Sequence, residues 1–139
     1  MTREAFLRLC AELPGAILDQ PFGGDFVTTV ARHLGNRRWF AILMERGDGP
    51  FVNLKCEPIK GAFLRGAYRG ITPGWHMNKE HWISVSLSAD VPDGLLRLLA
   101  EDSHRLTAPK RRKRGGGETP GDFIPQTPSP GSSSPEPIQ

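Results

Sequence analysis

The stretch that decides the fold is Phe51-Val52-Asn53-Leu54-Lys55-Cys56. Successive side chains of a β-strand point to opposite faces of the sheet. One face therefore takes Val52, Leu54 and Cys56, and the other takes Phe51, Asn53 and Lys55. The stretch 81–87 repeats the pattern, with Ile83, Val85 and Leu87 on one side and Trp82, Ser84 and Ser86 on the other. We expect a sheet with one face packed on helices and one polar face that carries a large aromatic ring and a cation.

Turn-forming residues divide the chain around these strands. Strands are predicted at 26–32, 37–45, 51–56 and 81–87, with a loop at 19–25, turns at 34–36 and 47–50, and an extended or looped segment at 71–78. Three helices are expected, the first capped by Thr2. Their predicted apolar faces are Phe6, Leu9, Cys10 and Leu13; then Ile59, Ala62 and Phe63; then Val91, Leu95, Leu98 and Leu99. The predicted fold is an α+β two-layer sandwich, an antiparallel sheet with helices on one face.

Length and composition exclude several classes of protein. The chain has 139 residues, a mass of 15.3 kDa and a mean hydropathy of −0.38. No apolar run approaches the roughly 20 residues that span a bilayer, so we expect neither a transmembrane helix nor a membrane partner. The first residues lead into a mixed helix, so we expect no secretory signal. Two cysteines exclude a disulfide-rich scaffold and a four-cysteine zinc site, and a reducing cytoplasm is the expected location.

The positive charge is unevenly distributed. The net charge is +3 and the pI is near 9.2, yet residues 1–108 hold 13 basic and 12 acidic residues. The excess lies in the cluster Lys110-Arg111-Arg112-Lys113-Arg114. Beyond it, 15 of the 25 residues from 115 to 139 are Pro, Gly or Ser, which predicts disorder. We therefore expect one domain over 1–108 and a disordered tail over 109–139, basic at first and then rich in Pro, Gly and Ser.

The segment 73–82 is the main candidate site, and two interpretations of it stay open. In the structural one, Pro73 and Gly74 set a turn, polar side chains satisfy loop backbone groups, and Trp82 anchors the strand. In the functional one, the segment forms a binding surface that combines charge, hydrogen bonds and a stacking ring. That surface would use Lys55 and Lys79 for charge, His76, Asn78 and His81 for hydrogen bonds, and Trp82 or Trp75 for stacking.

Neither a metal site nor a catalytic site is predicted. His76 and His81, with Cys56 as a third ligand, lack the fixed geometry of a helical metal motif. Cys56 lies on the predicted core face, where a cysteine behaves as a small apolar residue. The sequence has no Gly-rich phosphate loop, paired-carboxylate signature or serine elbow, so we expect a protein without cofactor that is not an enzyme. A convergent cluster of the two histidines and Cys56 in a deep pocket would revive the enzymatic alternative.

The same segment carries a resemblance to a known family. Pro73-Gly74-Trp75-His76-Met77-Asn78-Lys79-Glu80-His81-Trp82 resembles the Pro-Gly-aromatic-His-Met-Asn-Lys-x-His-Trp stretch of the MmcQ/YjbR family. Similar matches lie at 13–23, at Trp39-Phe40-Ala41, at 52–58 and at 101–106. The resemblance implies a fold like that of the bacterial frataxin CyaY and a DNA-binding role. Where many relatives have Tyr after the serine of the last helix, this chain has His104.

These observations predict a DNA-binding protein whose contacts are weak and mainly phosphate-driven, with RNA as the other possible nucleic-acid partner. The predicted contact residues are Lys55, His76, Asn78, Lys79 and Trp82, with Arg37, Arg38, Arg65 and Arg69 at the rim and the cluster 110–114 as a basic arm. The near-neutral domain supports an alternative, a non-enzymatic module that binds protein or a small ligand and has no nucleic-acid role.

Overall fold

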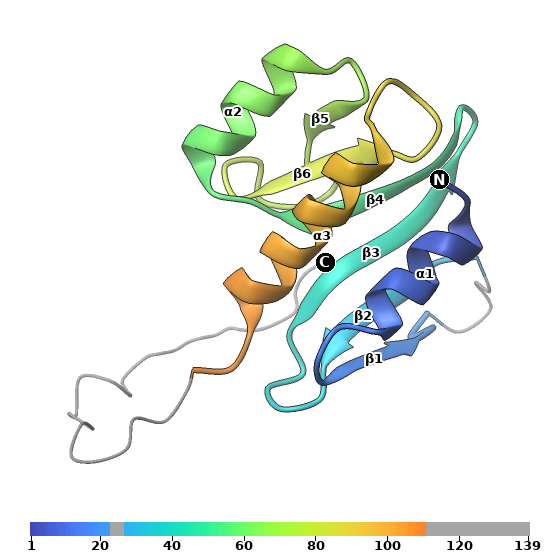
Figure 1. The fold of residues 1–139 in the computed structure, drawn as a ribbon, viewed down its shortest axis with the longest axis vertical. Coiled ribbons are helices and arrows are strands. Elements are labelled where there is room, and N and C mark those ends of the chain that lie inside the picture. Colours follow the sequence, from blue (N-terminus) through green and yellow to red (C-terminus); the bar gives the residue numbers. More distant parts are fainter. Residues whose placement is uncertain (23–26, 111–139) are drawn as a thin grey trace.

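Six strands form one antiparallel sheet in the order β1-β2-β3-β4-β6-β5 (Figure 1). The computed structural model describes residues 1–22 and 27–110. The strands are β1 (Ala16–Asp19), β2 (Thr29–His33), β3 (Trp39–Arg46), β4 (Gly49–Lys55), β5 (Ile71–Pro73) and β6 (Trp82–Ser86). The helices are α1 (Arg3–Ala11), α2 (Pro58–Ala67) and α3 (Asp93–Thr107). The predicted α+β class is confirmed, and Thr2 caps α1 as expected, its side chain accepting a hydrogen bond from Ala5 N at 3.0 Å.

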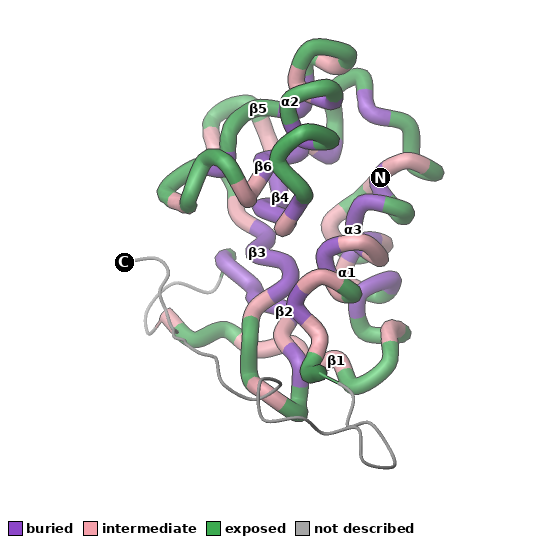
Figure 2. The backbone as a smooth tube through the Cα atoms, turned by 90° about the vertical axis from the view of Figure 1, so that its left-hand side faces the viewer, coloured by how far each residue is buried: buried purple, intermediate pink, exposed green. Residues whose placement is uncertain are grey.

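The helices cover one face of the sheet, which we call the core face. Figure 2 shows α1 and α3 on the same side of β2 and β3. Phe6 and Cys10 of α1, Leu64 of α2 and Leu99 of α3 are buried in one apolar cluster with the strands. That cluster includes Val52, Leu54, Cys56, Ile83, Val85 and Leu87, so the alternation predicted for 51–56 and 81–87 is confirmed on this face.

Two predicted helix faces need correction. In α2 the buried residues are Gly61 and Leu64, whereas Ile59, Ala62 and Phe63 are exposed. In α3 Leu96 is buried and Leu98 is exposed, although Val91, Leu95 and Leu99 pack as predicted. The reason is the same in both helices. Apolar residues occur on more than one side, and a period of 3.6 does not tell which side meets the sheet.

The strands also differ from their predicted bounds. Residues 16–19 form β1, which pairs with β2 from Ala16↔His33 to Asp19↔Val30, so Asp19 belongs to a strand and not to the predicted loop. Residues 71–73 form β5 at the other edge, paired with β6. Both are short edge strands, and strands of this length carry little periodicity for a sequence pattern to reveal.

A bulge interrupts β3 where it passes β2. Ala31 pairs with Ala41, but Arg32 pairs with Trp39, which leaves Phe40 as the extra residue. Phe40 and Ala41 both point into the core. Residues before Phe40 therefore face the side opposite to the one that simple alternation along β3 predicts. The hydroxyl of Ser103 on α3 fixes this region. It donates to Phe40 O at 2.6 Å and accepts from the backbone N–H of Lys55 at 2.8 Å.

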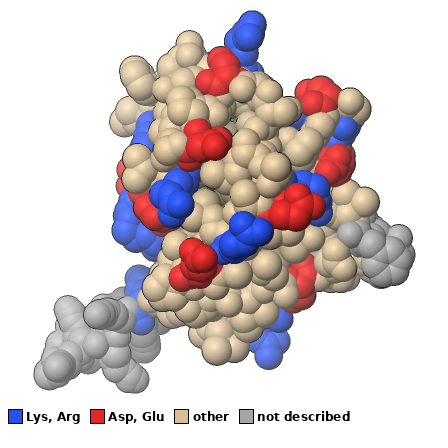
Figure 3. Space-filling view, turned by 45° about the vertical axis from the view of Figure 1, so that its right-hand side comes forward, with Lys and Arg blue, Asp and Glu red and all other residues tan. Residues whose placement is uncertain are grey.

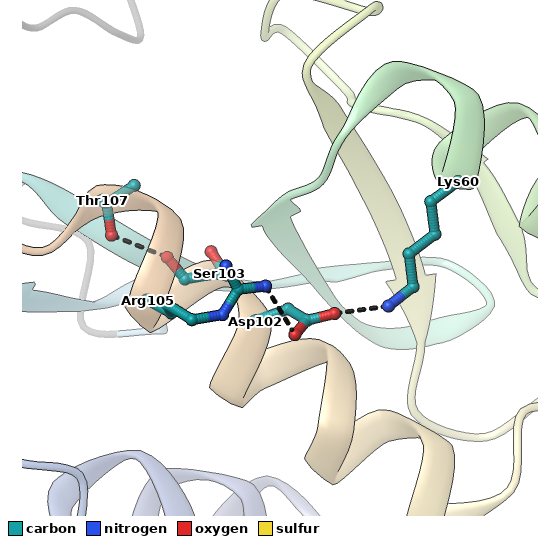
Figure 4. Close-up of polar contacts among 5 residues, drawn as sticks. All are labelled: Lys60, Asp102, Ser103, Arg105 and Thr107. Atoms are coloured by element: carbon teal, nitrogen blue, oxygen red, sulfur yellow. Dashed lines mark hydrogen bonds and ion pairs between the residues drawn. The ribbon is translucent and has the colours of Figure 1, made fainter.

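A buried histidine, His33 at the end of β2, contacts the last turn of α3. The hydroxyl of Thr107 donates to Ser103 O at 2.7 Å (Figure 4), so it accepts from His33 Nε2 at 2.9 Å. The ring of His104 lies 4.5 Å from that of His33, and its Nε2 donates to Pro14 O at 2.7 Å. Burial is the main cause that lowers the pKa of His33 to about 4; the charges of His104 and Arg38 act in the same direction, and a hydrogen bond with the backbone of His104 opposes them.

Two further predictions concern the C-terminal tail and membrane-spanning helices. The predicted disordered tail falls, from residue 111 onward, outside the described residues. Within the ranges 1–22 and 27–110, no helix has both the length and the apolar character needed to cross a bilayer.

Candidate nucleic-acid interface

The segment 74–81 folds back over the sheet face opposite the helices, which we call the second face. Trp75 N donates to Ser84 Oγ at 2.9 Å, and Asn53 Nδ2 donates to Trp75 O at 2.9 Å. Ser84 Oγ in turn donates to Asn53 Oδ1. The ring of Phe51 meets that of Trp75 edge to face, with centroids 5.8 Å apart. The expectation of an open polar face is therefore wrong here. Phe51 and Asn53 are each only 1% exposed, because the loop covers them.

Three residues, Gly74, Asn78 and Lys79, stabilise the conformation of the loop. Asn78 Oδ1 accepts from the backbone N–H groups of Glu80 at 2.9 Å and His81 at 3.2 Å. Lys79 Nζ donates to Gly74 O at 2.6 Å. A Cβ on Gly74 would lie 2.7 Å from Cβ of Trp82, so only glycine fits there. These contacts of Asn78 and Lys79 are those that the structural interpretation of the segment predicts.

His76 and Trp75 stand at the tip of the loop. His76 is exposed and has a left-handed backbone, with φ of 58°. Its ring lies perpendicular to that of Trp75, with centroids 4.0 Å apart. A non-glycine residue in this backbone region is uncommon and costs energy, so the loop holds His76 in place at the surface. His81 contributes its carbonyl, which accepts from Cys56 N at 2.8 Å.

Lys55 and Trp82 form the charged part of the second face. They are partners across β4 and β6, and Lys55 Nζ lies 5.6 Å from the centroid of the Trp82 ring. Both side chains are half-buried. Burial lowers the pKa of Lys55, and the positive charge of Arg38 lowers it further. This ammonium group is thus partly desolvated and lies near a second cation.

The bulge adds a ring that the sequence pattern did not single out. Because Phe40 and Ala41 both face the core, Trp39 points to the second face, on the strand next to Lys55. Trp39 is half-buried and packs edge to face against Phe22, with centroids 6.0 Å apart. We call Trp39, Lys55 and Trp82 the tryptophan–lysine row. A simple alternation count along β3 gives no signal for Trp39, since a bulge shifts that count by one.

Arg37 and Arg38 lie at the turn that leads into β3. Both are exposed, and Arg37 has φ of 64° while its N–H donates to His33 O at 2.8 Å. Arg38 N donates to Asn36 Oδ1 at 3.0 Å, which leaves its guanidinium outside this turn contact. Within the described ranges, the ion pairs involve Met1, Arg3, Arg32, Arg46, Lys60 and Arg105, and none joins Arg38 or Lys55 to a carboxylate.

The other predicted basic residues lie apart from the row. Arg65 is on α2, which packs against the core face, and Arg69 is in the turn between α2 and β5. Lys110 is exposed, just after α3. Arg111, Arg112, Lys113 and Arg114 lie outside the described residues. The structure thus brings Lys55 and Trp82 together, with Arg38 close enough for its charge to lower the pKa of Lys55, and places Arg65 and Arg69 on other elements.

The described residues around Cys56 give little support for a metal site or a reactive thiol. Cys56 is buried, and burial raises the pKa of its thiol, so the thiol stays protonated at neutral pH. In the part of the chain that the structure describes, no three His, Cys, Asp or Glu side chains lie together in a way that could hold a metal ion.

Charges of both signs alternate on the side of the molecule drawn in Figure 3. Lys and Arg lie among Asp and Glu there, and this view is that of Figure 1, with α1 and α3 in front, turned by 45°. Ion pairs such as Arg3–Glu45 and Lys60–Asp102 account for part of the mixture. A surface of this kind attracts phosphates weakly, which leaves the row on the second face as the better candidate.

Comparison with known proteins matches the YjbR family model to residues 11–106. The chain belongs to the YjbR family. It is 39% identical to the uncharacterized protein YbdF of Escherichia coli O157:H7 over 111 residues, which cover 80% of this chain and 88% of that protein. It is 33% identical to the uncharacterized protein YyaQ of Bacillus subtilis (strain 168), covering 77% of this chain and 98% of that protein. The predicted family membership is confirmed.

Solved structures agree with the fold. A crystal structure of a Pseudomonas syringae protein has a TM-score of 0.71 and 33% identity, covering 78% of this chain and 100% of that one. A Deinococcus radiodurans protein, DR2400, has a TM-score of 0.67 and 35% identity, covering 76% of this chain and 77% of that one. Membership of the YjbR family therefore establishes the fold of this chain, and the ligand has to be argued from its own residues.

Proposed function

We propose that this YjbR-family protein binds DNA, without enzymatic activity, through the tryptophan–lysine row and Arg38. The observation that carries the proposal is the half-buried ammonium of Lys55, which lies 5.6 Å from the centre of the Trp82 ring and has no carboxylate paired to it in the described residues, while the positive charge of Arg38 lowers its pKa. Two neighbouring cations repel each other, and a phosphate placed between them would relieve that repulsion. Trp39 and Trp82 lie on β3 and β6, the strands on either side of the β4 that carries Lys55, and aromatic rings suit bases that can stack.

Stacking on these rings favours single strands over duplex. Trp39 and Trp82 belong to strands separated only by β4, so about 10 Å lies between their backbones, from two strand spacings of about 4.8 Å. That span fits one or two unpaired nucleotides. Bases in a duplex are stacked on each other and do not offer their faces to such rings. The contacts are mainly electrostatic and independent of sequence, and the cluster 110–114 adds charge.

The test is a fluorescence-anisotropy titration of the full chain with labelled single-stranded and duplex oligonucleotides, at about 50 and 200 mM salt. Lys55→Gln and Arg38→Gln are compared with Arg97→Gln, which removes an exposed cation from α3 on the other side of the sheet. We expect tighter binding to the single strand. Lys55→Gln and Arg38→Gln should each also lower the slope of log affinity against log salt by about 0.7. Arg97→Gln should behave like the parent protein.

Absence of binding at the lower salt concentration would overturn the proposal. Binding that neither Lys55→Gln nor Arg38→Gln weakens would also overturn it and would assign the activity to the cluster 110–114. The small span of the row favours a second candidate, a module that binds one small anionic ligand with an aromatic ring. Quenching of tryptophan fluorescence by a mononucleotide, without oligonucleotide binding, would support that candidate.

A further inference from the structure

The end of helix α3 is fixed to the turn 34–38, which joins β2 to β3. Asn36 makes the central contact. Its amide nitrogen donates to Thr107 O at 3.0 Å, and its amide oxygen accepts from the backbone N–H of Arg38 at 3.0 Å. The hydroxyl of Thr107 also bonds to His33 Nε2 at 2.9 Å, directly before the turn. One side chain therefore links the last residue of α3 to the backbone of Arg38.

The residues that follow α3 stay at this turn. Pro109 packs against Gly35, since a Cβ built on that glycine would lie 2.9 Å from Pro109 Cγ. Lys110 comes next and is exposed. It is the first residue of the cluster 110–114, whose other members lie outside the described residues. A chain advances by at most about 3.5 Å per residue, so the Cα atoms of all five cations lie within about 18 Å of Pro109.

Arg37 and Arg38 lie in the turn, between the end of α3 and the tryptophan–lysine row. The backbone N–H of His33 donates to Arg38 O at 2.9 Å, and Arg38 directly precedes Trp39 of the row. Burial is the main cause that lowers the pKa of Lys55 and of His33, and the charge of Arg38 acts in the same direction on both. Arg38 is thus near one group on each face of the sheet.

We propose that the cluster 110–114 and the row, joined through Arg37 and Arg38, bind one single strand of DNA as a composite cationic site. This inference rests on the proposed function and extends it to a strand longer than the one or two nucleotides that the row spans. Arg37, Arg38 and Lys110 have no ion pair within the described residues. Successive phosphates of one strand would relieve the repulsion among these cations better than a mononucleotide does.

The position of the cluster makes its contact with the strand intramolecular. Once the row holds one nucleotide, the cluster meets the neighbouring phosphates at an effective concentration set by the short connection to Pro109. That concentration falls roughly as the −3/2 power of the length of the connection. The cations now lie on average about 3 residues after Pro109, so lengthening the connection to about 15 residues would lower the effective concentration about tenfold. A cluster that acts independently of the row predicts no such dependence.

The test inserts about 12 Gly and Ser residues between Pro109 and Lys110 of the full chain, which changes no charge and comes after the contact of Pro109 with Gly35. The matched control carries the same insertion after Gly116, beyond the cluster. Fluorescence anisotropy measures the affinity for a labelled single strand of about ten nucleotides at about 50 mM salt. We expect the insertion after Pro109 to weaken binding about tenfold and the control insertion to leave binding unchanged.

A double-variant comparison separates this inference from the proposed function. In a chain that carries Lys55→Gln and Arg38→Gln, the insertion after Pro109 should lose most of its effect, because the first contact with the strand is gone. If those substitutions weaken binding but the two insertions bind alike, the composite site is wrong and the proposed function stands. An equal effect of the insertion with and without the substitutions also contradicts the composite site. Absence of binding by the parent protein contradicts both. Far-UV circular dichroism of each variant checks that the fold is kept.

Discussion

Protonation of His33 should make the domain sensitive to mild acid. The ring is buried between β2 and the end of α3, where its Nε2 bonds Thr107 Oγ1 and its face meets His104. The pKa is about 4 in the fold and 6.5 in a free histidine. The unfolded chain therefore takes up a proton at a pH where the folded chain does not. Stability from this residue is fully present above pH 6.5 and is lost as the pH falls toward 4.

The size of the effect follows from the two pKa values. One pH unit corresponds to about 1.4 kcal/mol for one proton, so the difference between about 4 and 6.5 gives a loss of about 3 kcal/mol by pH 4. That is a large fraction of the total stability of a small domain. Burial is the largest cause of the low pKa, the charges of His104 and Arg38 also disfavour a proton on the ring, and a hydrogen bond with the backbone of His104 partly offsets these effects.

The assay is urea unfolding at intervals between pH 7.5 and 4, for the parent protein and for His33→Gln. Below pH 6.5 the parent should lose about 3 kcal/mol more than the variant, because the glutamine does not titrate. Carboxylates such as Asp102, whose pKa is lowered by hydrogen bonds from Lys60 and Arg105 against an opposing effect of burial, titrate in both proteins and cancel in the comparison. Equal losses in the two proteins would refute the assignment to His33.

Three further substitutions probe the elements around the row. Ser103→Ala should lower the free energy of unfolding by about 2 kcal/mol in a urea titration, because it leaves the N–H of Lys55 and a carbonyl of the bulge without a partner. Gly74→Ala should cost about 1–3 kcal/mol in the same assay, since the added methyl group meets Trp82 at 2.7 Å. Arg37→Gly should raise the free energy of unfolding by about 1 kcal/mol and so raise the melting temperature slightly. Arg37 has a left-handed backbone with φ of 64°, which glycine adopts without strain.

Sequence patterns predicted the core side of this protein well. The alternation in 51–56 and 81–87 identified the strand faces that meet the helices, and the apolar spacing of α1 identified Phe6, Leu9 and Cys10. Burial on this side follows local periodicity where an element has a single apolar face, as β4, β6 and α1 do, whereas α2 and α3 have apolar residues on more than one side.

The second face could not be predicted in the same way. Asn53 and Ser84 have the polar character of exposed residues, yet they are buried because they bond to Trp75 of a loop more than 20 residues away from Asn53 in sequence. No local pattern specifies where such a loop lies. Trp39 was missed for a related reason, since the bulge at Phe40 reverses the alternation of β3.

Ser103 connects the two sides of the sheet. Its side chain is fully buried on the core side and bonds to the backbone of Phe40 and of Lys55. Both are linked to the row, because Phe40 follows Trp39 in the chain and the side chain of Lys55 is itself part of the row. The carbonyl that it binds follows directly after Trp39, and the N–H is that of Lys55 itself. The docking of α3 thus fixes the backbone from which the ring of Trp39 and the ammonium of Lys55 project. The positions of both groups on the second face follow from a contact on the opposite one, which is why a surface description of the row alone would not explain its geometry.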